Sequence, residues 1–284
     1  MTAADTAVRG ITVGGRTLSP GFIVGTSILA VWVLLALLAP AAAPHDPLAT
    51  VSGAREAPSP DFWFGTDRLG RDVFSRVIHG ARVSLVLGFI SVAIGAVLGS
   101  ALGLVSGYYR GAVDTVAMRI VDAMLAFPDI LLALVVIAAL GPSITNVMVA
   151  VGVSTIPRYA RLVRSSVLTI REQDYIDAAR LVGVPDVKIM LRHVLPNTAI
   201  PLLVLSTLEF GQAISIGAGL SFLGLGAQPP TPEWGLMVAV GRDVLGRAWW
   251  ISTFPGLAIF TVVMATNLLG DSLQEMLDPR LKSR

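Results

Sequence analysis

Long apolar stretches alternate with polar segments along most of this chain. The first stretch, residues 21–39, carries no charge, and a helix of about 20 apolar residues crosses the hydrocarbon core of a bilayer. Five further stretches lie at residues 83–105, 120–140, 143–157, 197–222 and 249–270. The pattern predicts an all-α integral membrane protein with six transmembrane helices, the fourth of which continues out of the membrane.

The polar segments divide the chain further. Residues 1–20 and 271–284 form tails, residues 40–82 form a long loop, and residues 158–196 form a second polar loop within the membrane core 83–270. Three alanines at 41–43 resemble a signal-peptide cleavage site. The apolar run before them is longer than that of a typical signal peptide, which favours a first span that stays attached as an anchor.

The second half of the long loop has helical spacing from Phe64 onward. Asp67 and Arg71, and likewise Asp72 and Arg76, are four residues apart, a spacing that favours ion pairs on a helix. We therefore predict an amphipathic helix that lies along the membrane surface. The alternating charges are also compatible with an active site, but a solvated face of ion pairs is the simpler interpretation.

Two features inside the predicted spans carry structural information. Gly95 and Gly99 have the GxxxG spacing that lets a second helix approach closely. Glu209 lies near the middle of the fifth span, where a charge costs about 2.5–3.5 kcal/mol on insertion scales. It either faces a transport pathway or a partner subunit, or is hydrogen-bonded inside the bundle.

The segment 175–197 is a polar island between two spans. Its pattern predicts a first short helix from Ile176 to Val182, a bend at Gly183, and a second helix that Pro196 terminates. Glycine at the bend is suited to a positive φ angle. A pair of short helices with apolar and basic faces, held between membrane spans, predicts a docking element for another protein.

Composition agrees with a membrane protein and excludes several activities. Of the 284 residues, 54% are hydrophobic and only 14% are charged, against about a quarter charged in soluble domains. The chain has no cysteine, no HExxH motif, no GxSxG motif and no basic stripe typical of nucleic-acid binding. Neither lysine lies in a phosphate-binding loop, so the energy for any transport comes from an ion gradient or from a partner protein.

The distribution of basic residues predicts the orientation. If the N-terminus is cytoplasmic, 14 of the 21 Lys and Arg residues lie on the cytoplasmic side. Cytoplasmic loops of membrane proteins are enriched in these residues. We therefore predict that both termini and the segment 175–197 face the cytoplasm.

Several motifs carry a resemblance to a known family. Asp177-Ala178-Ala179, Gly183 and Leu195-Pro196 match the spacing of the signature loop of ATP-binding-cassette (ABC) importer permeases. FGTDRLGRDVFSR at 64–76, LSFLGLGAQPPTPEWG at 220–235, FPG at 254–256, and NLLGD and LDPRL near the C-terminus resemble the C-type permease of dipeptide, oligopeptide and nickel importers. Asp177 stands where the family has Glu, His193 where it has Ile, and Gly217 where relatives often have Glu.

The resemblance implies a type I importer permease fold in a bacterial inner membrane, without enzymatic activity of its own. It implies a heterodimer with a homologous permease, two cytoplasmic ATPase subunits that hold ATP and Mg²⁺, and an extracytoplasmic binding protein that delivers the substrate. No cofactor is expected in this chain. The residues expected to couple to the ATPase are Asp177, Ala178, Ala179, Gly183, His193, Leu195 and Pro196. The residues expected to contact the binding protein are Gln228, Glu233 and Trp234.

Three questions stay open at the level of sequence. The cargo is a dipeptide or an oligopeptide, with nickel chelates and glutathione-like peptides as further candidates. An ion-gradient-driven carrier, using Asp122, Asp129 or Glu209, is the alternative mechanism. The segment 175–197 also resembles a DNA-binding helix-turn-helix, but its attachment to spans at both ends argues against nucleic acid as a partner.

Overall fold

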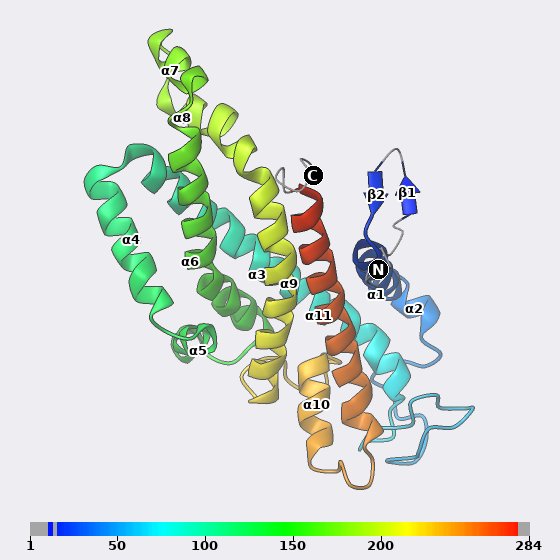
Figure 1. The fold of residues 1–284 in the computed structure, drawn as a ribbon. Coiled ribbons are helices and arrows are strands. Elements are labelled where there is room, and N and C mark those ends of the chain that lie inside the picture. Colours follow the sequence, from blue (N-terminus) through cyan, green and yellow to red (C-terminus); the bar gives the residue numbers. More distant parts are fainter. Residues whose placement is uncertain (1–10, 14–15, 278–284) are drawn as a thin grey trace, which may run out of the picture.

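The computed structural model describes residues 11–13 and 16–277 of the chain as an elongated bundle of helices (Figure 1). A short antiparallel pair of strands precedes the bundle, within the segment that the sequence predicts as a polar tail. The elements are β1 (Ile11–Val13), β2 (Arg16–Leu18), α1 (Pro20–Leu37), α2 (Ala39–Ala42), α3 (Val73–Tyr109), α4 (Gly111–Leu125), α5 (Asp129–Leu140), α6 (Ile144–Ile170), α7 (Asp174–Leu181), α8 (Asp186–Ile189), the π-helical turn η1 (Met190–Val194), the 3₁₀ turn η2 (Leu195–Thr198), α9 (Ala199–Phe222), α10 (Trp234–Arg242) and α11 (Trp250–Leu277).

Within the described residues, four helical segments are long and apolar enough to cross a membrane. They are α1, α3, the continuous stretch Asp186–Phe222 that includes α9, and α11. The predicted third span, 120–140, is wrong as a single helix, because α4 and α5 meet at an angle of 98°. Pro128 explains the break, since a proline keeps the preceding residue out of the α conformation.

The predicted amphipathic helix at 64–82 is also wrong in two respects. The observed helix begins later, and most of the charged side chains of this segment are buried. Asp72 caps a helix that begins at Val73, accepting a hydrogen bond from the Ser75 amide at 3.0 Å, and this helix continues to Tyr109 as α3. The segment before it is not helical. The predicted pair between Asp67 and Arg71 exists at 2.7 Å, but Arg76 approaches Asp67 at 3.6 Å instead of Asp72.

Helices α3 and α6 pack closely along a row of glycines on α3. A Cβ atom on Gly95 would lie 1.9 Å from the Thr155 hydroxyl, and one on Gly99 would lie 2.5 Å from the Tyr159 Cβ atom. The close approach predicted from the GxxxG spacing is therefore confirmed. Helix α6 continues from this contact towards the segment α7–α8. Its packing against α3 therefore fixes the position of the helix that carries this segment.

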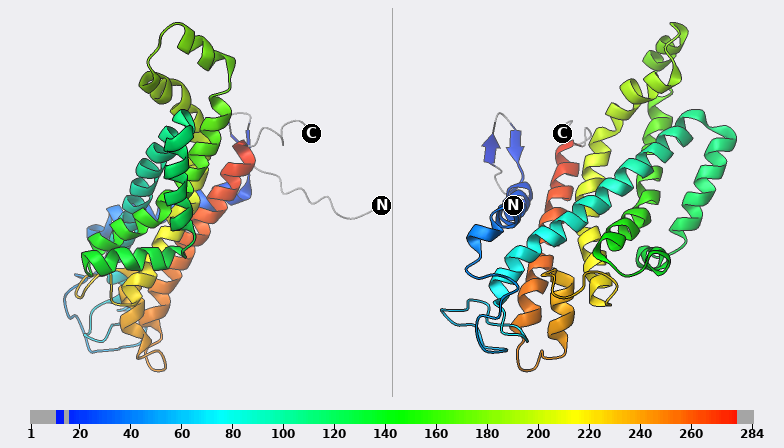
Figure 2. Two further views of the ribbon diagram at one scale, coloured as in Figure 1. Left: turned by 90° about the vertical axis from the view of Figure 1, so that its left-hand side faces the viewer. Right: turned by 180° about the vertical axis from the view of Figure 1, so that it is seen from behind.

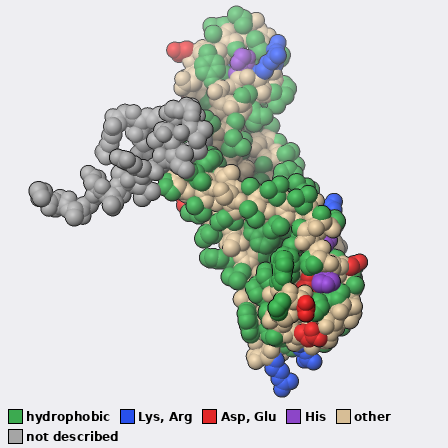
Figure 3. Space-filling view, turned by 90° about the vertical axis from the view of Figure 1, so that its right-hand side faces the viewer, with side chains coloured by type: hydrophobic (Ala, Val, Ile, Leu, Met, Phe, Trp, Pro, Cys, Tyr) green, Lys and Arg blue, Asp and Glu red, His purple; other side chains and the backbone are tan. Residues whose placement is uncertain are grey.

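The two ends of the bundle are built differently (Figure 2). At one end, α7 and α8 project beyond the other helices; at the opposite end, α10 and the non-helical segment 43–72 lie together. The Ser19 hydroxyl donates to the Ser272 hydroxyl at 2.8 Å, so the start of α1 lies beside the last turns of α11. On the face shown in Figure 3, charged side chains gather at the two ends and hydrophobic side chains cover much of the middle.

Candidate functional site

The projecting segment α7–α8 is mounted on the ends of α3 and α6 by an apolar cluster. Ile176 and Ile189, from α7 and α8, are fully buried there against Tyr108 of α3 and Val163 and Val167 of α6. The burial of isoleucines from both short helices gives a segment of this size a fixed position on the bundle.

Polar contacts reinforce the same junction. The Tyr108 hydroxyl donates to the Asp186 carboxylate at 2.6 Å, and the Arg180 guanidinium lies over the Tyr108 ring, 5.4 Å from its centre. Arg180 also donates to the Asp177 carboxylate at 2.9 Å. Asp177, which the resemblance assigns to coupling, thus has a partner within its own helix, while its side chain stays 62% exposed.

The bend between the two short helices occurs where the sequence predicts it. Gly183 has a φ of +78°, and a Cβ atom there would meet no other atom within 4 Å. Glycine is therefore needed for the backbone conformation and not for space, because other residues adopt positive φ at a cost. Pro185 precedes α8 and forms its N-terminal boundary.

Pro196 does not terminate the second helix, contrary to the sequence prediction. The chain passes from α8 through the π-helical turn η1 and the 3₁₀ turn η2 directly into α9. A proline lacks the backbone N–H and its ring collides with the preceding helical turn. The wider turn before Pro196 accommodates both effects, so α8 and α9 belong to one connected helical stretch, Asp186–Phe222.

The residues predicted for coupling differ in exposure. Asp177, Ala178, Gly183 and Pro196 are exposed, whereas His193 is half-buried. Ala179 and Leu195 pack against the apolar cluster beneath the segment. Four exposed apolar side chains lie on neighbouring positions: Leu181 (89% exposed), Val182 (79%), Val187 (58%) and Leu191 (57%). The family motif does not mark these four residues, although their place on short polar helices is a usable signal for an interface.

Beneath the segment, a buried ion-pair cluster joins three helices. One Arg158 nitrogen on α6 lies 2.8 Å from both carboxylate oxygens of Glu209 on α9, and another nitrogen pairs with Asp129 at the start of α5. Glu209 is only 4% exposed. The Glu209 carboxylate is thus bonded to an arginine inside the bundle, and its place on a transport pathway or at a partner subunit stays a prediction.

Two further arginines of α6 pair with α4. Arg161 lies 2.7 Å from Asp122, and Arg164 contacts both oxygens of Asp114 at 2.5 and 2.6 Å. The sequence pattern predicts that these arginines lie where the fourth span continues out of the membrane, and it indicates no partners for them. The structure pairs each of them with a carboxylate that is 39 or 50 residues away in the sequence.

At the opposite end, the side chains predicted to contact a binding protein have internal roles. Glu233 is 1% exposed and caps α10, accepting hydrogen bonds from the Gly235 and Leu236 amides at 2.9 and 2.8 Å. Its burial raises the pKa of the carboxyl group. Trp234 is fully buried and donates to the Val77 carbonyl at 2.9 Å.

The third of these residues, Gln228, is exposed, and its amide donates to the Gly224 carbonyl at 3.1 Å. The contact of Gln228 with a binding protein stays a prediction, and Gln228 is the only one of the three side chains that is exposed.

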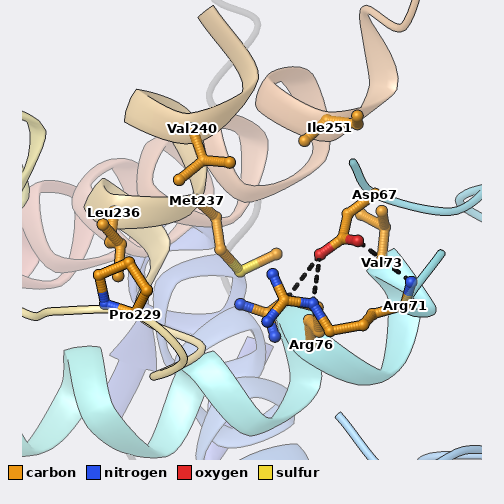
Figure 4. A pocket seen from close by; sticks show the side chains of 9 residues that line it. All are labelled: Asp67, Arg71, Val73, Arg76, Pro229, Leu236, Met237, Val240 and Ile251. Atoms are coloured by element: carbon orange, nitrogen blue, oxygen red, sulfur yellow. Dashed lines mark hydrogen bonds and ion pairs between the residues drawn. The ribbon is translucent and has the colours of Figure 1, made fainter. Parts of the chain in front are cut away.

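A buried charge cluster fixes the non-helical segment 43–72 at this end (Figure 4). Asp67, Arg71 and Arg76 are each less than 10% exposed, and all three line a small cavity beside Met237 of α10. Arg76 also donates to the Pro47 carbonyl at 2.7 Å. The alternating charges in the sequence therefore hold a loop against α10 and α3 and do not form a solvated helix face.

Among the described residues, no group of three or more His, Asp or Glu side chains could hold a metal ion.

Comparison with known proteins places this architecture. The family model described as "Binding-protein-dependent transport system inner membrane component" matches residues 99–283. The dipeptide transport system permease protein DppC of Alkalihalophilus pseudofirmus is 44% identical over 262 residues, covering 92% of this chain and 86% of the relative. The glutathione transport system permease protein GsiD of Escherichia coli is 48% identical over 252 residues, covering 88% and 83%.

Solved structures share the fold at low sequence identity. A structure of the MetNI methionine ABC transporter in inward-facing conformations aligns with a TM-score of 0.57 at 19% identity, over 72% of this chain and 97% of that chain. An amino acid ABC transporter with histidines aligns with a TM-score of 0.52 at 18% identity, over 70% and 92%. From the family match and these relatives, the chain belongs to the inner membrane components of binding-protein-dependent transport systems, the permease subunits of ABC importers.

Proposed function

We propose that this chain forms half of the membrane pathway of an ATP-driven importer for di- or oligopeptides in a bacterial inner membrane. The observation that carries this function is the segment α7–α8, which presents exposed apolar side chains at the end of a rigid support. The relatives named for dipeptides and for glutathione match most of the chain and support a peptide as the cargo.

The segment α7–α8 docks on a cytoplasmic ATPase subunit. Leu181 and Val182 at the bend present an apolar tip, which a cleft on the ATPase covers. ATP and Mg²⁺ are held by two such ATPase subunits and not by this chain. Because α7–α8 is continuous with α6 on one side and α9 on the other, closure of the ATPase pair moves both helices together.

Six membrane crossings, by α1, α3, α4, α6, α9 and α11, fit this function. An even number of crossings agrees with the contact between Ser19 and Ser272, which places the start of α1 beside the last turns of α11. The excess of arginine in the segment 158–192 supports a cytoplasmic position for α7–α8 and for both termini of the chain. The opposite end, with α10 and the segment 43–72, then faces the binding protein, with Gln228 as a contact.

A homologous second permease completes the pathway as a heterodimer. An ion-gradient-driven carrier finds less support, because the carboxylates of Glu209, Asp129 and Asp122 are paired with arginines. A relay for protons needs a carboxylate that gains and loses its proton during the cycle.

The function is tested by Gly183→Val in the complex reconstituted with its second permease, ATPase subunits and binding protein. A β-branched residue at positive φ strains the bend by roughly 1–2 kcal/mol and changes the shape of the docking surface. We expect the complex to assemble and hydrolyse ATP, while uptake of labelled peptide falls at least tenfold.

The matched control is Gly141→Val between α5 and α6. Gly141 has a φ of +88° and open surroundings, as Gly183 does, but it lies away from the docking segment. Normal uptake by the Gly183→Val complex would contradict the docking role. Uptake driven by a proton gradient, in vesicles that contain this chain without ATPase subunits, would support the carrier instead.

A further inference from the structure

A large groove separate from the docking segment opens between α1, α3, α9 and α11. It has a volume of about 690 Å³, within the range of roughly 300–1,000 Å³ that ligand pockets occupy. Helix α3 crosses the bundle obliquely beside α1, as the right-hand view of Figure 2 shows. The lining comes from all four helices and includes Val33, Val86, Phe89 and Leu203.

The polar groups in the groove are nearly all occupied by internal bonds. The hydroxyls of Thr207 and Thr266 donate to carbonyls of their own helices at 2.7 and 2.8 Å. Ser206 accepts a hydrogen bond from the Tyr159 hydroxyl at 3.1 Å. An occupant therefore meets an apolar surface that offers few hydrogen bonds. A peptide backbone would leave its amides unpaired there, at a cost of about 1–3 kcal/mol for each buried group.

Arg82 is the one charged residue among those that line the groove. Its side chain is exposed, and within the described residues no carboxylate lies at ion-pair distance from it. Arg82 also lies where the charged first turns of α3 give way to its uncharged part. The first turns of that helix carry Arg76, His79 and Arg82, and the sequence from Val83 to Tyr109 has no charged residue. Arg82 thus marks the boundary between the interface and the hydrocarbon core, where lipid phosphates lie.

We propose that this groove binds an anionic phospholipid, with an acyl chain between α1, α3, α9 and α11 and the headgroup phosphate on Arg82. The match is one of both shape and charge. The apolar walls suit an acyl chain, and the single free guanidinium at the interface pairs with a phosphate through charge-assisted hydrogen bonds. A helix of a second permease is the alternative occupant, and it would pair with Arg82 only if it brought a carboxylate to that level.

The test is native mass spectrometry of the purified full-length chain, mixed with phosphatidylglycerol or phosphatidylcholine of identical acyl chains. One basic residue near a lipid surface corresponds to roughly a fivefold preference for the anionic lipid. We expect that preference in the natural chain and its loss in Arg82→Gln, with retention of both lipids. Arg119→Gln is the matched control, because Arg119 is an exposed helical arginine without an ion pair in the described residues and lies outside the groove.

A second variant tests the acyl-chain part of the site. Val86 lines the groove and is 45% exposed, so Val86→Trp fills space without disturbing the buried core. We expect it to lower retention of both lipids. Unchanged preference in Arg82→Gln, or unchanged retention in Val86→Trp, would overturn the proposal. A photo-crosslinker at position 86 that reacts in the assembled transporter only with a second permease would show that the groove is a protein interface instead.

Discussion

Replacement of Arg158 by methionine gives a sharp test of the buried ion-pair cluster. Arg158 is the single cation between the Glu209 and Asp129 carboxylates, whose side chains are 6% and 21% exposed. Methionine retains much of the volume and the apolar contacts of arginine but leaves both carboxylates without their partner. The helices α5, α6 and α9 would then be held apart by uncompensated negative charge.

The expected magnitude follows from the burial of the cluster. Removing one partner of a buried ion pair costs about 3–5 kcal/mol. Arg158 itself is 29% exposed, so water offsets part of the loss, and we expect the lower end of that range. A loss of about 3 kcal/mol changes the unfolding equilibrium constant roughly a hundredfold, since each 1.4 kcal/mol is a factor of ten.

The assay is unfolding of the purified chain by dodecyl sulfate in mixed micelles, followed by the loss of helical circular dichroism. The double variant Arg158→Met with Glu209→Gln removes the most buried charge as well and should recover about 1–2 kcal/mol of the loss. Arg119→Met serves as the control and should stay within about 0.5 kcal/mol of the natural chain. A loss below about 1 kcal/mol for Arg158→Met, or no recovery in the double variant, would refute the assignment.

Three other predictions use the same unfolding assay. Gly99→Leu should destabilise the chain by about 1–3 kcal/mol, because a side chain there would force α3 away from α6. Gly219→Ala should not destabilise the chain, because no atom lies within 4 Å of the added Cβ atom. Equal effects of the two variants would rule out close packing as the cause. Arg164→Gln should cost more than Arg161→Gln, since the Arg161 pair is more than half exposed on both sides and exposed pairs contribute about 0–1 kcal/mol; the reverse order would contradict the burial argument. The pKa of Glu233 is raised by burial, so its contribution to stability should be largest at low pH and decline as the pH rises from about 4.5 through the folded-state pKa; Glu233→Gln should remove that pH dependence, and an unchanged profile would exclude Glu233 as its source.

The ion pairs of α6 show why the sequence did not reveal the partner of Glu209. Arg158 lies in a polar run of α6, where its spacing predicts a helix leaving the membrane, and Glu209 lies 51 residues later in an apolar span. Nothing local links the two positions. Their pairing depends on how α6 and α9 pack against each other. The row of glycines on α3 and the segment α7–α8, which connects the two helices, set this packing.

The end of the bundle that carries α10 shows the converse case. The run from Gln228 to Trp234 is polar and rich in proline, which predicts an exposed loop. In the fold, Glu233 becomes a helix cap and Trp234 becomes part of the core, because α10 folds back against α11 and α9. A polar residue that satisfies backbone amides can be buried, and a sequence pattern does not distinguish this role from that of a contact residue.

By itself, the sequence determined the class of protein, most of the spans, the bend at Gly183 and the family motifs, because apolar run length, glycine and proline act locally on the chain. The tertiary structure decided the angle of 98° between α4 and α5, the continuation of α8 through η1 and η2 into α9, and the arginine partners. These features depend on which helices approach one another. Contacts between residues far apart in the chain fix them, and hydrophobic periodicity contains no information about such contacts.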